Sequence, residues 1–272
     1  MMPKSHPPPN ELCQVAVQAA TAAGDALRTL WNQPREIRNK GFRDLVTDAD
    51  LAAQARIVAL IQARYSDHGF LTEEEAPDLP TIGPVRWIID PLDGTSNYSR
   101  QVPLFSVSVA AVDEQDRPLA GAIYDPMRSE GFAAAAGHGA FSWNRESSEQ
   151  RPLQVSQEME FIKTLVGFDW SRDPASRDII LAQMAQIAPR VHTVRAIGSA
   201  ALGLAWVAAG RMDAYFNMSL YHWDVAAGML LIQEAGGRIS DLRGEPWAPG
   251  GPGCLASNGL LHEKMLPLLF GK

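Results

Sequence analysis

The stretch Trp87-Ile88-Ile89-Asp90-Pro91-Leu92-Asp93-Gly94-Thr95-Ser96-Asn97-Tyr98 joins a short apolar strand to a tight turn that carries two carboxylates. Aromatic and β-branched residues favour a strand up to Ile89. Pro91 is expected to end this strand, because proline cannot donate a hydrogen bond to a sheet ladder. Asp90 and Asp93 can then converge beyond the strand end, where no sheet hydrogen bonds compete for them.

This turn suits two kinds of ligand. Gly94 lets the backbone approach a ligand closely, and the N–H groups of Gly94 and Thr95 can bind an anion such as phosphate. Asp90 and Asp93 offer the carboxylate oxygens that hard cations prefer. An ordinary surface loop is the alternative, because Asp, Gly, Ser and Asn are common turn residues.

Further acidic segments argue for the cation. They are Asp44-Leu45-Val46-Thr47-Asp48-Ala49-Asp50, Thr72-Glu73-Glu74-Glu75 and Trp223-Asp224-Val225-Ala226-Ala227-Gly228. Two charges about 4 Å apart repel by roughly 4 kcal/mol at an effective dielectric of 20. Carboxylates that share a cleft therefore raise one another's pKa or move apart unless a cation neutralises them. These motifs contain no thiolate or imidazole, which favours magnesium over zinc.

Composition sets broad limits on function. The chain has 272 residues, with 24 Lys+Arg against 31 Asp+Glu and a net charge of −7, and no dense basic run, so a nucleic-acid polymer is not an expected partner. Cys13 and Cys254 lie far apart in sequence, which favours a reducing, cytoplasmic compartment over a disulfide framework. Residues 1–10 are expected to be a disordered tail, not a signal peptide, and no apolar run reaches the length that crosses a membrane.

Hydrophobic periodicity divides the rest into two halves. In the N-terminal half, residues 11–150, we predict helices at 11–31, capped by Asn10, and at 50–65, with strands at 87–89, 106–112, 120–124 and 131–135. Residues 136–154 are either a domain junction or a hairpin. The C-terminal half, residues 151–272, alternates as an α/β unit does, with strands at 163–168, 191–195, 213–216 and 237–240 and helices at 175–187, 200–209 and 224–235.

In order and spacing, the four acidic motifs resemble the inositol monophosphatase family of magnesium-dependent, lithium-sensitive phosphatases, over residues 11–269. The resemblance implies an α+β or α/β sandwich of alternating helix and sheet layers, with the active site between the halves. It also implies two or three Mg²⁺ ions per active site, a small phosphorylated metabolite as substrate, no membrane partner, and a homodimer.

The resemblance further implies a role for each motif residue. The metal ligands are the side chains of Glu73, Asp90, Asp93 and Asp224 and the carbonyl of Leu92. Catalysis falls to Thr95 and Asp50, which orient and deprotonate a metal-activated water, together with Glu73. The substrate contacts are Asp93, Gly94, Thr95, Gly198, Ser199, Ala200, Asn217 and Asp224. Read without the resemblance, Asp50 and Asp224 are also typical of helix caps, while Glu74 is expected to support the site and Glu75 to be a solvated charge.

The leaving-group side departs from the family pattern. Asn217 stands seven residues before Asp224, where the family's inositol phosphatases commonly hold a glutamate, and an amide carries no charge. A 3′(2′),5′-bisphosphate nucleotidase, a fructose-1,6-bisphosphatase and a histidinol-phosphate phosphatase therefore stay open beside inositol phosphate. Arg128 and Arg172 are candidate cations for a second phosphate. A catalytically silent metal- or phosphate-binding regulator is the non-enzymatic alternative, and the complete carboxylate set argues against it.

Overall fold

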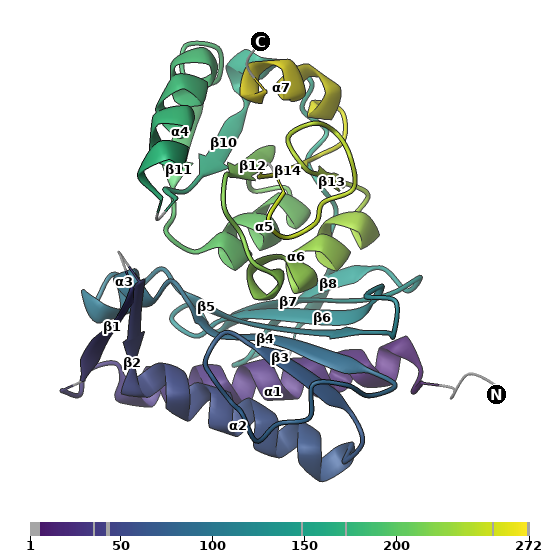
Figure 1. The fold of residues 1–272 in the computed structure, drawn as a ribbon. Helices are drawn as coiled ribbons and strands as arrows, with labels where there is room; N and C mark the ends of the chain where they lie inside the picture. Colours follow the sequence, from purple (N-terminus) through teal and green to yellow (C-terminus); the bar gives the residue numbers. More distant parts are fainter. Residues whose placement is uncertain are drawn as a thin grey trace.

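The computed structural model describes residues 6–34, 36–41, 44–147, 149–171, 173–251 and 253–270, apart from the side chains of Lys40 and Asp44. Helix and sheet layers alternate through the molecule (Figure 1). Helices α1 (Pro9–Leu30) and α2 (Asp48–Arg64) cover a seven-stranded sheet, and α5 (Ala200–Ala208) and α6 (His222–Glu234) separate it from a five-stranded sheet. Helices α4 (Pro174–Ile187) and α7 (His262–Leu269) form the outer layer. This layering confirms the predicted fold class.

The seven-stranded sheet has the order β3 (Gly69–Thr72), β4 (Arg86–Asp93), β5 (Ser106–Val112), β6 (Pro118–Asp125), β7 (Glu130–Ala135), β8 (Ala140–Asn144) and β9 (Gln150–Pro152). Its first pair of strands is parallel and its other pairs are antiparallel. Strands β8 and β9 show that residues 136–154 form the hairpin alternative. The domain boundary near residue 150 stays a prediction.

Strand β4 differs from its prediction, because Pro91 does not end it. Asp90 pairs with Ser108 and Asp93 with Ser106, so three steps along β4 match two along β5. Residues three apart in a regular strand point to opposite faces, and this bulge of one extra residue turns both carboxylates to the same face. The bulge also accommodates a residue that has no N–H to donate.

The five-stranded sheet has the order β11 (Thr193–Ala196), β10 (Leu165–Phe168), β12 (Ala214–Asn217), β14 (Cys254–Ser257) and β13 (Arg238–Ser240). Strand β10 lies between β11 and β12 and is parallel to both. The carboxyl ends of these three strands therefore meet at the edge of the sheet where α/β proteins bind ligands. The sequence patterns did not predict β14 or α7.

A shared apolar core fixes the two sheets relative to each other. Helices α5 and α6 contribute buried residues on both of their faces, among them Leu204, Ala227 and Leu231. The same cluster includes Ile88 and Phe132 from the larger sheet and, from the smaller sheet, Tyr215 and Ala256. Each large apolar side chain buried in this way contributes about 1.5–3 kcal/mol. The space between the sheets is therefore held at a defined width.

Several termini and short elements were not predicted. Helix α1 begins at Pro9 after Pro8, two residues before the predicted start, and Asn10 lies inside it and does not cap it. Proline suits a first helical position because its missing N–H would have no partner there. Residues 1–5 of the predicted tail lie outside the described part of the chain. The hairpin of β1 (Ile37–Gly41) and β2 (Asp44–Thr47) and the short helix α3 (Thr95–Ser99) were also missed.

None of the helices in the described ranges has both the length and the apolar character needed to cross a membrane.

Candidate active site

A cavity of about 700 Å³ is lined by residues of both sheets and of the segments next to them. One side is built by residues 90–95 of β4 and α3, which we call the carboxylate wall. The other is built by residues 169–171, 196–200 and 217–221, at the carboxyl ends of β10, β11 and β12, which we call the strand-end wall. Every predicted site residue except Asp50 lines this cavity: Glu73, Asp90, Leu92, Asp93, Gly94, Thr95, Gly198, Ser199, Ala200, Asn217 and Asp224.

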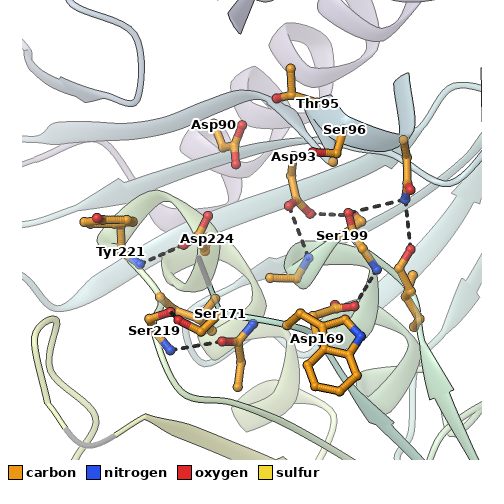
Figure 2. Close-up of a pocket in the computed structure, with 18 of the residues that line it drawn as sticks. Asp90, Asp93, Thr95, Ser96, Asp169, Ser171, Ser199, Ser219, Tyr221 and Asp224 are labelled. Carbon is orange, nitrogen blue, oxygen red and sulfur yellow. Dashed lines mark hydrogen bonds between the residues drawn. The ribbon is translucent and has the colours of Figure 1, made fainter. Parts of the chain in front are cut away.

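The carboxylates of Asp90, Asp93 and Asp224 point toward one another in the cavity (Figure 2). Each offers an oxygen, and these oxygens all lie within 4.8 Å of one another. Burial raises the pKa of Asp90 well above its usual value, and repulsion from Glu73, Asp93 and Asp224 adds to this rise. A buried set of oxygen ligands that repel one another fits a hard divalent cation such as Mg²⁺.

Glu73 joins this cluster from the end of β3. Its N–H donates to the Ile89 carbonyl at 3.0 Å, which continues the pairing of β3 with β4. Its carboxyl group contacts Asp90 and raises the pKa of that residue. The next two glutamates differ, because Glu74 is buried and Glu75 is exposed. Glu73 therefore lies beside the cluster, and the roles expected for the three glutamates stay predictions.

Asp93 connects the carboxylate wall to the first turn of α5. Its Oδ2 accepts hydrogen bonds from the Ser199 hydroxyl at 2.5 Å and from the Ala201 N–H at 2.8 Å, and its Oδ1 accepts from the Ala200 N–H at 3.1 Å. Ser106 donates a longer bond of 3.3 Å. The N–H groups of a first helical turn have no partner within their helix, so this carboxylate satisfies two of them. Burial raises the pKa of Asp93, and these hydrogen bonds oppose the rise.

Asp50 lies behind Thr95 and reaches the cavity through it. Its Oδ2 accepts from the N–H and the hydroxyl of Thr47 at 2.8 and 2.6 Å, which caps α2. Its Oδ1 accepts from the Thr95 hydroxyl at 3.2 Å, and that hydroxyl also lies 3.1 Å from the Leu92 carbonyl oxygen. The cap and the contact with Thr95 are therefore both present. Burial raises the pKa of Asp50 to about 6.

Asp224 combines two roles in the same way. It is the third residue of α6, and its Oδ2 accepts from the Tyr221 N–H at 2.7 Å, as in a capping box. Its carboxylate also belongs to the cluster with Asp90 and Asp93. Negative charge at a helix N-terminus is stabilised by the helix dipole, so this carboxylate is held in place from its own helix.

Two glycines let the walls approach each other. Gly94 has φ +100° and Gly198 has φ +74°, which is the left-handed region that favours glycine. A Cβ on Gly94 would lie 3.0 Å from the Gly198 carbonyl oxygen. Asn97 secures this approach, because its Nδ2 donates to the Ile197 carbonyl at 2.9 Å. A side chain at either glycine would separate the two walls.

Asn217 lines the cavity but is held mostly by the protein. Its Nδ2 donates to the Tyr215 hydroxyl at 3.2 Å, and its Oδ1 accepts from the Ser219 N–H at 3.0 Å. The second N–H of the amide and the second lone pair of its oxygen are left to meet a ligand.

Comparison with known proteins decides the family. The sequence profile described as "Inositol monophosphatase family" matches residues 9–270. The chain belongs to the inositol monophosphatase family. The inositol-1-monophosphatase of Synechocystis sp. is 36% identical over 255 residues, covering 93% of this chain and 86% of the relative. The protein called Nus factor SuhB of Escherichia coli is 37% identical over 235 residues, covering 86% of each chain.

Solved structures of family members agree. The extragenic suppressor protein suhB of Bartonella henselae superposes with a TM-score of 0.88 at 32% identity, covering 95% of this chain and 98% of the other. The IMPase of Thermotoga maritima superposes with a TM-score of 0.86 at 29% identity, covering 96% and 97%. Membership in the inositol monophosphatase family assigns the chain to the phosphoric monoester hydrolases.

Sequence reasoning missed most of the strand-end wall of this phosphatase. Asp169, Trp170 and Ser171 follow β10 and line the cavity, as do Ser219 and Tyr221 after β12. Burial raises the pKa of Asp169 to about 7. Their position directly after predicted strands was the available signal, because ligands bind beyond the carboxyl ends of parallel strands. No local motif marks these residues.

The cations near the cavity also differ from the prediction. Arg128 is not among the residues that line the cavity, and it donates to Asp125 Oδ2 at 2.6 Å. Arg172 lies outside the described residues. Arg100 and Arg177 line the cavity instead, and the Arg177 Nε donates to the Ser171 carbonyl at 2.7 Å.

Proposed function

We propose that this protein is a Mg²⁺-dependent phosphatase that hydrolyses a small phosphate monoester. The observation that supports this most is the convergence of Asp90, Asp93 and Asp224 beside the turn of Gly94 and Thr95. Two or three Mg²⁺ ions would be held by these carboxylates, by Glu73 and by the Leu92 carbonyl. Bound divalent cations stabilise charge on phosphate oxygens and make a coordinated water more acidic.

The chain's own groups prepare the attack. The N–H groups of Gly94 and Thr95 hold phosphate oxygens. The Thr95 hydroxyl orients the attacking water, with Glu73 beside it, and Asp50 receives a proton through Thr95. The pKa of Asp50, which burial raises to about 6, suits this task because a general base works best with a pKa near the working pH.

The leaving group faces the strand-end wall. Gly198, Ser199, Ala200, Asn217 and Asp224 are the proposed contacts. Inositol 1-phosphate is a candidate substrate because relatives are named for it. The neutral amide of Asn217 supports a wider range of small esters, since it can both donate and accept and carries no charge, whereas a carboxylate only accepts.

A non-catalytic interaction role is the second candidate. Relatives in Escherichia coli and Salmonella typhimurium carry the name Nus factor SuhB. The net charge of −7 speaks against direct binding of a nucleic-acid polymer. The complete set of carboxylates with Thr95 and Asp50 favours catalysis, because a protein that only binds a partner has no need of them.

We further propose a cytoplasmic homodimer with no membrane partner and with lithium sensitivity. Both cysteines are free and buried, which supports a reducing compartment. The homodimer and the lithium sensitivity rest on the family resemblance.

The test is a panel of phosphate esters offered to chelator-treated protein with and without Mg²⁺. The panel holds inositol 1-phosphate, fructose 1,6-bisphosphate, 3′-phosphoadenosine 5′-phosphate and histidinol phosphate. We expect phosphate release from at least one ester with Mg²⁺ and none without it. Asp93→Asn should abolish this release. Asp241→Asn is the matched control, because Asp241 is equally buried at 7% and also accepts two backbone N–H groups, outside the cavity. Release from no ester would favour the interaction role.

A further inference from the structure

Asp169 is a buried carboxylate of the strand-end wall that the proposed chemistry does not use. It lines the cavity with 8% of its surface exposed (Figure 2). Its Oδ1 accepts from the Gly198 N–H, and its Oδ2 accepts from the Tyr215 hydroxyl at 2.9 Å. Burying a carboxylate is costly unless hydrogen bonds compensate it. The two bonds to Asp169 therefore fix the position of its side chain relative to Gly198 and Tyr215.

The register of the sheet explains how one carboxylate reaches both partners. Phe168 of β10 pairs with Ala196 of β11 on one side and with Phe216 of β12 on the other. Asp169 is the next residue, so it leaves the sheet between the turn that follows β11 and the end of β12. It therefore bridges two segments that are not adjacent in sequence.

The turn that Asp169 holds is the same turn that holds Asp93. Gly198 donates to Asp169, and the next three residues, Ser199, Ala200 and Ala201, all donate to Asp93. A carboxylate of the strand-end wall is thus linked through four consecutive residues to a carboxylate of the cluster. A shift of this turn would change the direction in which Asp93 points.

The Tyr215 hydroxyl anchors Asp169 from behind. This hydroxyl accepts from Asn217 Nδ2 at 3.2 Å and has one hydrogen to donate, which goes to Asp169. Tyr215 is fully buried, so its ring cannot move aside without disturbing the core. The network therefore has a single hydrogen-bond direction, from Asn217 through Tyr215 to Asp169.

We propose that Asp169 is a positioning residue for phosphate ester hydrolysis, acting through the turn of residues 198–201 on Asp93. This proposal rests on the proposed function. It assigns Asp169 no contact with the reacting atoms; its task is to keep the Ser199 hydroxyl and two backbone N–H groups aimed at the cluster.

The test compares Asp169→Asn and Asp169→Ala with Asp213→Asn. Asp213 is a matched control because it is also 8% exposed and accepts one backbone N–H, from Leu165 at 2.7 Å, and one hydroxyl, from Ser156 at 2.5 Å. It lies outside the cavity lining. For each variant we would measure the thermal midpoint, kcat, KM and the affinity for Mg²⁺ by calorimetry.

We expect all three variants to lose thermal stability to a similar degree. Asp169→Ala should lower kcat about tenfold to a hundredfold, the scale expected for a misplacement of catalytic groups by roughly 1 Å, and should weaken Mg²⁺ binding, while KM changes less. In Asp169→Asn, kcat and Mg²⁺ affinity should fall less than in Asp169→Ala, because the amide oxygen can still accept from the Gly198 N–H. Asp213→Asn should keep the parent's kcat and Mg²⁺ affinity.

Equal changes of kcat and Mg²⁺ affinity in the Asp169 and Asp213 variants would overturn the proposal. If Asp169→Ala does not fold, Tyr215→Phe removes one bond to Asp169 and should give a smaller loss of the same kind. A parent that binds Mg²⁺ but hydrolyses none of the esters would contradict the proposed function alone, and the calorimetric comparison would still decide the role of Asp169. A parent that binds no Mg²⁺ would overturn both.

Discussion

The carboxylate wall and the strand-end wall face each other across one cavity but are built differently. Residues 90–95 are consecutive, and a single bulged strand aims both of their carboxylates at the cavity. The strand-end wall gathers residues from three segments, 169–171, 196–200 and 217–221, at one edge of a parallel sheet. The first arrangement is local in sequence, and the second exists only once the sheet has formed.

The two walls also differ in electrostatics. The carboxylate wall contains acids whose pKa burial and mutual repulsion raise, as for Asp90. The strand-end wall has one buried acid, Asp169, whose pKa burial also raises and whose hydrogen bonds from Gly198 and Tyr215 oppose that rise. We therefore expect changes in the carboxylate wall to affect cation binding and turnover directly. Changes in the strand-end wall should affect substrate preference, as at Asn217, or act on the cluster indirectly, as at Asp169.

Asp90→Asn should have the most severe consequence. It keeps the shape of the side chain but removes a charge from the centre of the cluster, so turnover should fall by about 10⁴-fold or more, as for other essential catalytic groups. The measurement is the initial rate of phosphate release at saturating Mg²⁺. A variant that keeps a tenth of the parent rate would remove Asp90 from the cation site.

Thr95→Ala should separate catalysis from cation binding. Loss of a group that orients water and relays a proton costs about 10²–10⁴-fold in kcat, whereas Mg²⁺ affinity should change little. Rates and calorimetric affinities measured side by side check this. Thr164→Ala is the control, because the Thr164 hydroxyl also lies within hydrogen-bond distance of a carbonyl three residues earlier, that of Phe161 at 2.7 Å. If Thr95→Ala lowers only the Mg²⁺ affinity, its proposed role is wrong.

Asp50→Asn should change how stability depends on pH. Burial raises the pKa of Asp50 to about 6 in the folded protein, whereas an unfolded aspartate titrates near 3.9. Between about pH 4 and 6 the folded state therefore binds more protons, so the free energy of unfolding of the metal-free protein falls as the pH rises through this window. The total fall in the free energy of unfolding that Asp50 causes is on the order of 1–3 kcal/mol.

Urea unfolding in chelator at pH 4, 5, 6 and 7 measures this dependence. The parent should lose stability toward pH 7, and the Asp50→Asn variant should lose less. If the free energy of unfolding depends on pH in the same way in both proteins, the pKa of Asp50 is not raised in the folded state.

Asn217→Glu should produce the mildest change, and it belongs to the strand-end wall. Hydrogen bonds to a charged group are worth about 1.5–3 kcal/mol against about 1 for neutral pairs, so the ratio of kcat/KM for inositol 1-phosphate to that for other esters should rise several-fold. The ratio is measured across three or four esters. An unchanged ratio would mean that residue 217 does not face the leaving group.

The contrast between the walls also explains what could be predicted from the sequence. The acids of β4, the glutamate after β3 and Asp224 stand in short motifs, so their convergence was foreseen. The bulge at Pro91 was not, because it depends on how β4 pairs with β5. A strand that ends at proline and a strand that bulges around it have the same local sequence.

Asp169 shows the complementary case. A lone aspartate after an apolar strand has no motif, and its importance arises from the register that places Phe168 between Ala196 and Phe216. Residues 136–154 are a further example, because their turn-rich composition fits a junction and a hairpin equally well. The pairing of β8 with β7 and β9 shows the hairpin, and the domain junction stays a prediction.

The central claim is that the carboxylates of the carboxylate wall bind Mg²⁺ and that this ion is required for hydrolysis. Chelator-treated protein would be titrated with Mg²⁺ while phosphate release from its best ester and the heat of binding are recorded together. We predict no release at zero Mg²⁺ and a rate that rises along the binding curve, with both signals lost in Asp93→Asn. Full turnover in metal-free buffer would contradict the account.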